Sequence, residues 1–343
     1  MEKGVSGEVA RAALAAVIAF PDGGAARRAM ARAVLTGAAE DRGFQRAVAT
    51  ALAEKVPAVE KTIAAAGWRW IAWSDPDCPA LLAALADPPL GVFVRGQLPD
   101  TRAVALVGSR RATAYGREVA EYLGKELARA GVWVISGMAR GVDAAAHRGA
   151  LASSGRTVAV WGCGPDRIYP AEHAALAAEI ARRGCLLTEY PPGSPPLAHH
   201  FPERNRLVAG LARVVVVVEA NERSGALITA RLALDEGREV MAVPGSVFSR
   251  LSAGPNGLLR AGAAPVLGPT DILEVLGVSA PPPAEEGEDE LTAVIPGGEA
   301  VTVDHLAALT GWPVARVLEA LVTAELRGAV VREPDGRYRR CRA

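Results

Sequence analysis

Residues 103–151 read AVALVGSRRATAYGREVAEYLGKELARAGVWVISGMARGVDAAAHRGAL, and this stretch decides the fold. It contains two short apolar runs, Ala103-Val107 and Val132-Ser136, and each is followed by a glycine-containing turn and a helical pattern. Short, continuously apolar runs are typical of strands that are buried on both faces of a sheet. Strand, turn and helix in repetition predict parallel strands that are joined by crossover helices.

Further runs of the same kind follow along the chain: Thr157-Trp161, Cys185-Thr188, Val214-Glu219 and Glu239-Val243. We therefore predict an α/β fold with a doubly wound, mainly parallel sheet over residues 67–277. Ligands of such sheets bind beyond the carboxyl ends of the strands, so the loops that follow the strands are where a site is expected.

The two flanks of this region differ from it in composition. Residues 1–66 are rich in Ala, Arg and Glu, and they predict a small helical bundle that is broken at Pro21 and Pro57. Residues 281–290, PPPAEEGEDE, combine prolines with acidic residues, which is typical of a linker. We place this acidic, proline-rich linker at residues 278–297.

Residues 298–343 predict a winged helix. Val303-Thr310 and Pro313-Leu326 have helical patterns, and the strands Ala329-Arg332 and Arg337-Arg340 flank an Asp-Gly turn. Helix, helix and hairpin in this order are the elements of that module.

Composition limits the possible partners and the compartment. Lys plus Arg and Asp plus Glu both number 38, so no overall field draws the chain to nucleic acid, and binding must use local patches. The four cysteines form no C-x-x-C pair, which predicts a reducing, cytoplasmic setting without a disulfide framework or zinc site. No run approaches the length of a membrane helix, so we expect no membrane partner.

Three of the loops after strands have the composition of anion sites. The first contains Gly108, Ser109 and Arg110, where backbone N–H groups and a guanidinium could hold a phosphate. The alternative is a structural turn with a surface arginine. The loop contains neither G-x-G-x-x-G nor a Walker lysine, which disfavours dinucleotide and nucleoside triphosphate binding.

The second and third loops repeat this composition. Gly137, Arg140 and Gly141 follow the second strand, and Ser224 and Gly225 stand where a later helix should begin. His147, one turn into the helix after the second strand, is expected to be a packed side chain rather than a catalytic one. Three such loops at one sheet edge indicate a site for several phosphates.

Residues 198–206, AHHFPERNR, are the richest segment of the chain. Phe201 could stack on a base, and polar and basic side chains at the start of the same helix could hold the backbone: His200, Arg204, Asn205 and Arg206. The pair His199-His200 lacks a third ligand at fixed spacing, so no metal site is predicted.

At these residues the sequence resembles the DNA-processing protein A family (DprA or Smf). The motifs that carry the resemblance are VGSR at 107–110, SGMARGVDAAAHRGAL at 136–151, GCGPDRIYP at 162–170, TEYPPGSPP at 188–196, HHFPERNRLVAGL at 199–211, SGALITA at 224–230 and AVPG at 242–245, with DPPLGVFVRG at 87–96 upstream. The layout also resembles the longer family members, with a helical N-terminal domain, an extended Rossmann domain and a C-terminal winged helix.

The resemblance implies a homodimer that binds incoming single-stranded DNA in natural transformation, protects it and helps to load the RecA recombinase. It implies no catalysis and no cofactor. The DNA pocket of the family maps onto residues 108–110 and 200–206, which gives binding roles to Arg110, Phe201, Arg204, Asn205 and Arg206. The lysines that family members often carry around this pocket are absent here, and Pro255 stands where a cysteine or similar residue is expected.

Two other functions remain open at this point. A nucleoside-monophosphate phosphoribohydrolase of the lysine-decarboxylase-like type would also hold phosphate with glycine-rich loops. That enzyme needs a P-G-G-x-G-T loop with a catalytic glutamate, and Arg223-Leu227 stands near that position instead. A transcription regulator is the third possibility, because winged helices often bind duplex DNA and the hairpin here is rich in arginine.

Overall fold

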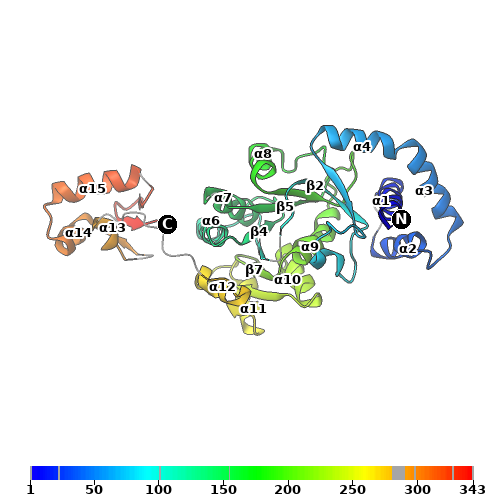
Figure 1. Cartoon of the computed structure of the whole chain (residues 1–343). Helices are drawn as coiled ribbons and strands as arrows, with labels where there is room; N and C mark the ends of the chain where they lie inside the picture. The colour runs from blue at the N-terminus through cyan, green and yellow to red at the C-terminus, as the bar shows by residue number, and fades with distance from the viewer. Residues whose placement is uncertain are drawn as a thin grey trace. The chain divides into compact units, whose positions relative to one another are not determined.

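The computed structural model of the chain describes residues 2–21, 24–99, 102–153, 155–279, 290–296, 299–326 and 328–341. The chain divides into two compact units, residues 1–280 and 281–343 (Figure 1). Each unit has a hydrophobic core of its own.

A nine-stranded sheet organises the described residues of the first unit, with the order β1-β2-β6-β5-β4-β3-β7-β8-β9. From β6 to β9 neighbouring strands are parallel, whereas β1 and β2 are antiparallel additions at one edge. The bounds are β1 Arg69–Ala72, β2 Gly91–Gly96, β3 Ala103–Val107, β4 Trp133–Ser136, β5 Thr157–Trp161, β6 Cys185–Thr188, β7 Val214–Val217, β8 Glu239–Ala242 and β9 Ala264–Pro265. The six predicted strands and the mainly parallel sheet are confirmed.

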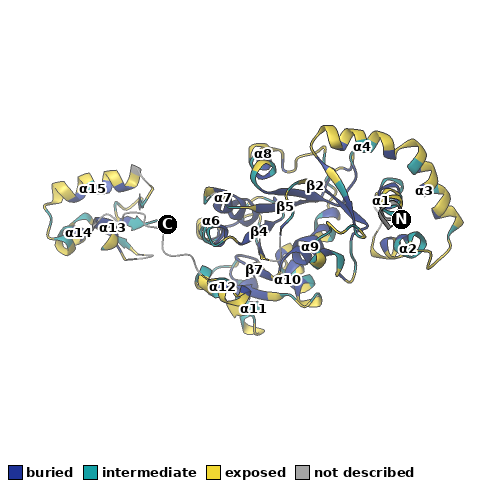
Figure 2. Ribbon diagram, viewed as in Figure 1, coloured by how far each residue is buried: buried dark blue, intermediate teal, exposed yellow. Residues whose placement is uncertain are grey.

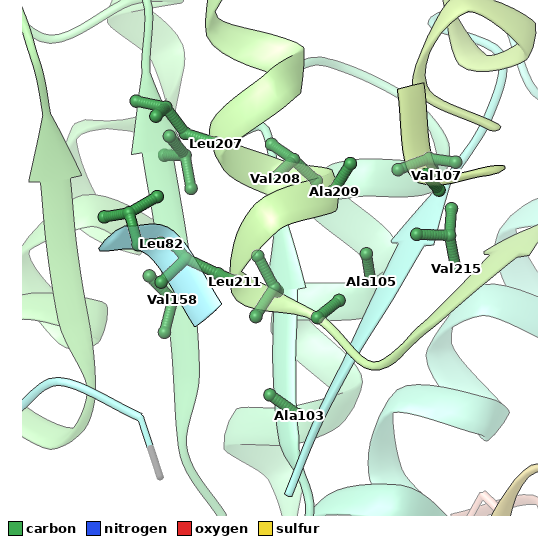
Figure 3. Packing of buried hydrophobic residues seen from close by; sticks show 14 of the residues in the cluster. Leu82, Ala103, Ala105, Val107, Val158, Leu207, Val208, Ala209, Leu211 and Val215 are labelled. Atoms are coloured by element: carbon green, nitrogen blue, oxygen red, sulfur yellow. The ribbon is translucent and has the colours of Figure 1, made fainter. Parts of the chain in front are cut away.

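Helices cover both faces of this sheet. One face is covered by α6 (Ala114–Arg129), α7 (Val142–Ala152) and α12 (Pro269–Leu276), and the other by α5 (Ala80–Ala83), α9 (His200–Leu211) and α10 (Gly225–Asp235). Strand side chains alternate between the two cores, so Val104 and Leu106 face α6 while Ala103 and Ala105 face α9. Figure 3 shows Leu207, Val208 and Leu211 of α9 lying over the strands.

The N-terminal helices share a core with the antiparallel edge of the sheet. They are α1 (Glu2–Ala19), α2 (Ala25–Leu35), α3 (Arg42–Glu54) and α4 (Val56–Ala65). Leu14 and Phe44 belong to one buried cluster with Phe93 of β2 and Trp161 of β5. Figure 2 shows these helices buried on their inner sides and exposed on their outer sides. The domain boundary after residue 66 stays a prediction.

Around the sheet, α8 (Ala174–Arg183) follows the short 3-10 helix Ala171–His173, and α11 (Ala253–Arg260) precedes β9.

Two cysteines of this unit, Cys163 and Cys185, are buried, and burial raises the pKa of their thiols to about 11 and about 12, respectively. Among the described residues, no single helix is long and apolar enough to cross a membrane, although the helices at Val303–Thr310 and Val314–Glu325 pass that test together as a bent pair by length and composition.

The second unit is a winged helix, as predicted. It consists of α13 (Glu290–Ala293), β10 (Ala300–Val301), α14 (Val303–Thr310), α15 (Val314–Leu326), β11 (Val330–Arg332) and β12 (Tyr338–Arg340), with the sheet order β10-β12-β11. One prediction needs correction here: Leu291 and Ile295, placed in the linker, are buried in this core. Because these two side chains are part of the core, the packed unit begins before residue 298. The acidic residues around them gave this segment the composition of a linker. Residues 280–289 of the linker lie outside the described residues.

Candidate nucleic-acid interface

The loops after β3, β4 and β7 meet α9 and α10 around an open pocket of about 390 Å³. The pocket lies beyond the carboxyl ends of the strands, where a doubly wound sheet binds its ligands. Most of the predicted site residues line it, namely Gly108, Ser109, Arg110, Gly137, Arg204, Asn205, Ser224 and Gly225. Residues outside the predicted set also line it, among them Arg111, Ala139, Asp143, Asn221, Thr229 and Leu251.

The loop after β3 supplies cations to this pocket rather than free backbone donors. The Ser109 N–H donates to the carbonyl oxygen of Glu219 at 2.6 Å, and the Ser109 hydroxyl accepts from the Arg111 N–H at 3.1 Å. A Cβ at Gly108 would lie 2.5 Å from Val142 Cγ2, so this glycine permits close packing of the loop. Arg110 and Arg111 are exposed, and neither is paired with a carboxylate in the part of the chain that the structure describes.

The loop after β4 does not offer the anion site that its composition predicts. The Asp143 carboxylate accepts from the N–H groups of Gly137 at 3.1 Å and Ala139 at 3.2 Å, so the loop binds its own carboxylate. Burial raises the pKa of Asp143, against the opposing charge of Arg204. Gly141 has φ +76°, and a Cβ there would lie 2.2 Å from the Ser109 carbonyl oxygen. Gly141 therefore allows the loops after β3 and β4 to approach each other closely.

Arg140 of the same loop lies outside the residues that line the pocket. It is exposed and forms an ion pair with Glu172. The hydrogen bond and charge of Glu172 raise the pKa of Arg140. The hydrogen bond from Arg140 in turn lowers the pKa of Glu172. Because this guanidinium already has an anionic partner, a phosphate would have to compete with the carboxylate.

Phe201, in the first turn of α9, is the centre of an aromatic surface beside the pocket. Its ring lies 5.3 Å from that of Tyr169, and the Arg110 guanidinium lies 5.1 Å from the Phe201 ring centroid. Phe201 is half-buried and Tyr169 is 42% exposed. Tyr169 was not among the predicted site residues, although its motif, GCGPDRIYP, is one of those that carry the resemblance.

Arg204 forms the floor of the pocket and is almost completely buried. Its Nη1 donates to the carbonyl oxygens of Gly137, at 2.6 Å, and of Val160. Burial lowers the pKa of Arg204, and the charge of Asp143 opposes that effect. Arg204 therefore holds the ends of β4 and β5 together. Asn205 lies at the rim, where its Nδ2 donates to the Gly225 carbonyl oxygen at 3.4 Å.

Two predicted ligands, His200 and Arg206, point away from the pocket. His200 is fully buried, stacks on Tyr190 with ring centroids 4.0 Å apart, and has its Nδ1 3.2 Å from the Gly162 carbonyl oxygen. Arg206 is buried and paired with Glu189 and Asp87. Both contact roles are therefore corrected: neither side chain is free to reach DNA, because each is packed within the protein.

Arg206 belongs to an ion cluster that joins α9 to α2, formed by Arg28, Asp87, Glu189 and Arg206. The Arg28 Nε donates to both Asp87 oxygens at 3.1 Å and lies 3.9 Å from Glu189 Oε1. The Arg206 Nη1 donates to the Asp87 carbonyl oxygen at 3.0 Å. Burial would raise the pKa of Asp87, but the hydrogen bond from Arg28 and the charges of Arg206 and Arg28 lower it. We call this group the α2–α9 ion cluster.

The loop after β7 delivers a helix start to the pocket, as predicted. Ser224 caps α10, and its hydroxyl accepts from the Ala226 N–H at 3.3 Å. Gly225 is the exposed first residue of that helix. The positive end of the α10 dipole thus lies at the pocket wall, where it favours an anion.

His147 is structural, as expected. It is fully buried, and its Nδ1–H donates to Thr157 Oγ1 at 2.6 Å, since that hydroxyl donates its own proton to the Val134 carbonyl oxygen. Burial lowers the pKa of His147 to about 3.

In the described residues of the winged helix, the positive charge of the hairpin is partly neutralised. Arg337 pairs with Asp335 at 2.7 Å and Arg339 with Glu333 at 3.0 Å, so carboxylates offset part of the hairpin charge. Helix α15, which has the position of the recognition helix, exposes the apolar side chains Val314, Leu318 and Val322. This surface disfavours the transcription-regulator alternative.

Comparison with known proteins agrees with this arrangement. Residues 69–277 match the family described as DNA recombination-mediator protein A, and residues 278–336 match the DprA winged helix domain. Protein Smf of Escherichia coli K12 is 40% identical over 282 residues, which cover 77% of this chain and 75% of that protein. A putative DNA processing protein DprA of Mycobacterium tuberculosis H37Rv is 48% identical over 254 residues, 71% of this chain and 65% of that protein.

Solved structures show the same fold. DNA processing protein A from Streptococcus pneumoniae has a TM-score of 0.59 and 34% identity, covering 68% of this chain and 85% of that one. DNA processing protein A from Helicobacter pylori has a TM-score of 0.56 and 31% identity, covering 61% of this chain and 95% of that one. The latter structure is described in terms of a single-stranded DNA binding mode.

Proposed function

The chain belongs to the DNA recombination-mediator protein A family, and from this premise we propose that it binds single-stranded DNA as a recombination mediator in natural transformation. One observation carries the proposal: the pocket combines exposed arginines, which have no carboxylate partner among the described residues, with an aromatic ring beside them. Arg110 and Arg111 supply charge for phosphates, while Phe201 supplies a face for any base. This combination fits a flexible strand better than a duplex, whose bases are already stacked.

We also propose that the pocket binds without a turnover reaction. Asp143 is the carboxylate among the lining residues, and its oxygen accepts from two loop N–H groups. A phosphoribohydrolase needs a carboxylate that is aimed at its substrate. Here the carboxylate is used to shape the loop after β4, which favours binding over hydrolysis.

The proposed partners are single-stranded DNA, a second copy of this chain and the RecA recombinase. The family description as a recombination mediator supports the last of these, because a mediator delivers DNA to a recombinase. We propose a cytoplasmic location for the same reason.

A salt-dependent titration tests the proposal. We expect the full chain to bind an unstructured single strand more tightly than a duplex of equal length, with affinity that falls as salt rises. Fluorescence anisotropy at three salt concentrations measures both properties. Equal or tighter binding to the duplex would reject the proposed function, and release of free base from AMP would restore the enzyme alternative.

A further inference from the structure

Another aromatic side chain, Phe248, lies at the same sheet edge as the pocket, and no role has been assigned to it. It is 95% exposed, and its neighbour Val247 is 85% exposed. Both belong to the loop after β8, the strand next to β7 in the sheet. Exposing a large apolar ring to water is energetically unfavourable, so an exposed phenylalanine points to a ligand that covers it.

The loop that carries Phe248 is held in place by hydrogen bonds. The side chain of Asn256 in α11 pairs with Gly245 twice, accepting from its N–H at 3.2 Å and donating to its carbonyl oxygen at 3.0 Å. The Phe248 N–H donates to the Ser246 hydroxyl at 3.3 Å, and the Ala220 N–H donates to the Leu251 carbonyl oxygen at 2.7 Å. The exposed ring is therefore presented on an ordered turn.

This loop is continuous with the proposed DNA pocket. Leu251, three residues beyond Phe248, lines the pocket, and Ala220 joins the same loop to the end of β7. Arg223 and Arg250 are exposed on the two adjacent loops, and in the described ranges neither is paired with a carboxylate. A DNA strand that leaves the pocket and passes over the ends of β7 and β8 would meet the positive charges of Arg223 and Arg250 and then the ring of Phe248.

We propose that Phe248 is a second base-stacking residue, which holds a nucleotide of the same DNA strand outside the pocket. This inference rests on the proposed function and extends its binding surface from the loops after β3 and β7 to the loop after β8. Stacking on an exposed ring favours no particular base, so the extension lengthens the bound segment without adding sequence preference.

The test compares Phe248→Ala with wild type on two lengths of oligothymidylate, about 5 and about 20 nucleotides, because binding sites of this kind span roughly 4–16 nucleotides. We expect Phe248→Ala to weaken binding of the longer strand about 5- to 20-fold and to leave the shorter strand unchanged. Phe248→Trp should retain wild-type affinity, and Val247→Ala is the matched control at an adjacent exposed apolar position. Photo-crosslinking of a 5-iodouracil strand, mapped by mass spectrometry, should label Phe248.

The other outcomes separate this inference from the proposed function. If Arg110→Ala weakens both lengths while Phe248→Ala changes neither, Phe248 does not stack and only this inference fails. If neither variant alters binding, the pocket itself is wrong. If Phe248→Ala changes the sedimentation coefficient but no DNA affinity, the ring is a contact between protein chains and the inference is overturned.

Discussion

Two groups of arginines near helix α9 differ in burial and in their partners. In the α2–α9 ion cluster, Arg28 and Arg206 are buried against carboxylates, whereas Arg110 and Arg111 of the pocket are exposed and have no carboxylate partner within the described residues. Removing a buried arginine leaves buried carboxylates with less compensating positive charge, so the cost falls on folding. Removing an exposed one releases fewer counterions from DNA, so the cost falls on binding. Under the proposed function, arginines therefore serve stability in the α2–α9 ion cluster and recognition in the pocket.

The largest expected effect is on the buried side. Arg206→Met should lower the free energy of unfolding by about 3–5 kcal/mol, because Glu189 and Asp87 would lose a buried cation. Urea unfolding of the full chain measures the loss, and Arg213→Met, at an exposed position just after α9, is the control that should change little. If Arg206→Met kept its stability but lost DNA affinity, Arg206 would serve recognition rather than folding.

Phe201→Ala tests the recognition side with the next largest effect. We expect DNA binding to weaken by about 1–3 kcal/mol while the dependence on salt stays nearly unchanged, because a stack is lost and no charge. Phe201→Tyr keeps the ring and should keep the affinity. A large fall in melting temperature, with unchanged affinity of the folded fraction, would make Phe201 a core residue instead.

A change of pH should alter the stability of the protein through the buried side chain of His147. The pKa of His147 is lowered to about 3 in the folded protein, so between its ordinary value of 6.5 and 3 the unfolded chain binds the extra proton. Stability therefore falls as pH falls through this window, by about 2 kcal/mol from this group at pH 5.

The variant His147→Gln isolates this contribution. The difference in unfolding free energy between pH 7 and pH 5 should be about 2 kcal/mol smaller in His147→Gln than in wild type. His305→Gln, at an exposed position in α14, should leave that difference as it is in wild type. Equal pH dependence in all three proteins would show that His147 is not held neutral by burial.

The smallest expected effect distinguishes two exposed arginines. Arg110→Ala should reduce the slope of log affinity against log salt by up to about one unit, since one phosphate contact is lost. Arg140→Ala should change the slope less, because Glu172 already neutralises that guanidinium. Equal slopes for Arg110→Ala and wild type would remove Arg110 from the phosphate contacts.

The strands that the sequence predicts best are those whose signal is local. Continuous apolar runs such as Ala103–Val107 fix the parallel strands, whereas β1 and β2 depend on antiparallel pairing with each other and with β6. β9 has only two residues, too few for a periodic signal. The winged helix was predictable because each of its helices and its turn has a clear pattern.

The site was predicted only in part, for a geometric reason. The loops after β3 and β7 follow from strand ends, but the roles on α9 depend on direction around the helix. At about 100° per residue, Arg204 and Arg206 point roughly 200° apart, so one helix cannot aim both into one pocket. The partners that occupy Arg206, Asp87 and Glu189, are distant in sequence, and no local pattern identifies them.

The double anchoring of α9 has a consequence for the energetics of recognition. Arg204 ties the helix to the ends of β4 and β5, and Arg206 ties it to the α2–α9 ion cluster. Phe201 and Asn205 therefore stand on a support that is ordered before DNA arrives. In the proposed complex, less of the entropy lost on binding would come from α9 and more from the DNA strand, so the stiffness of the DNA would influence its affinity.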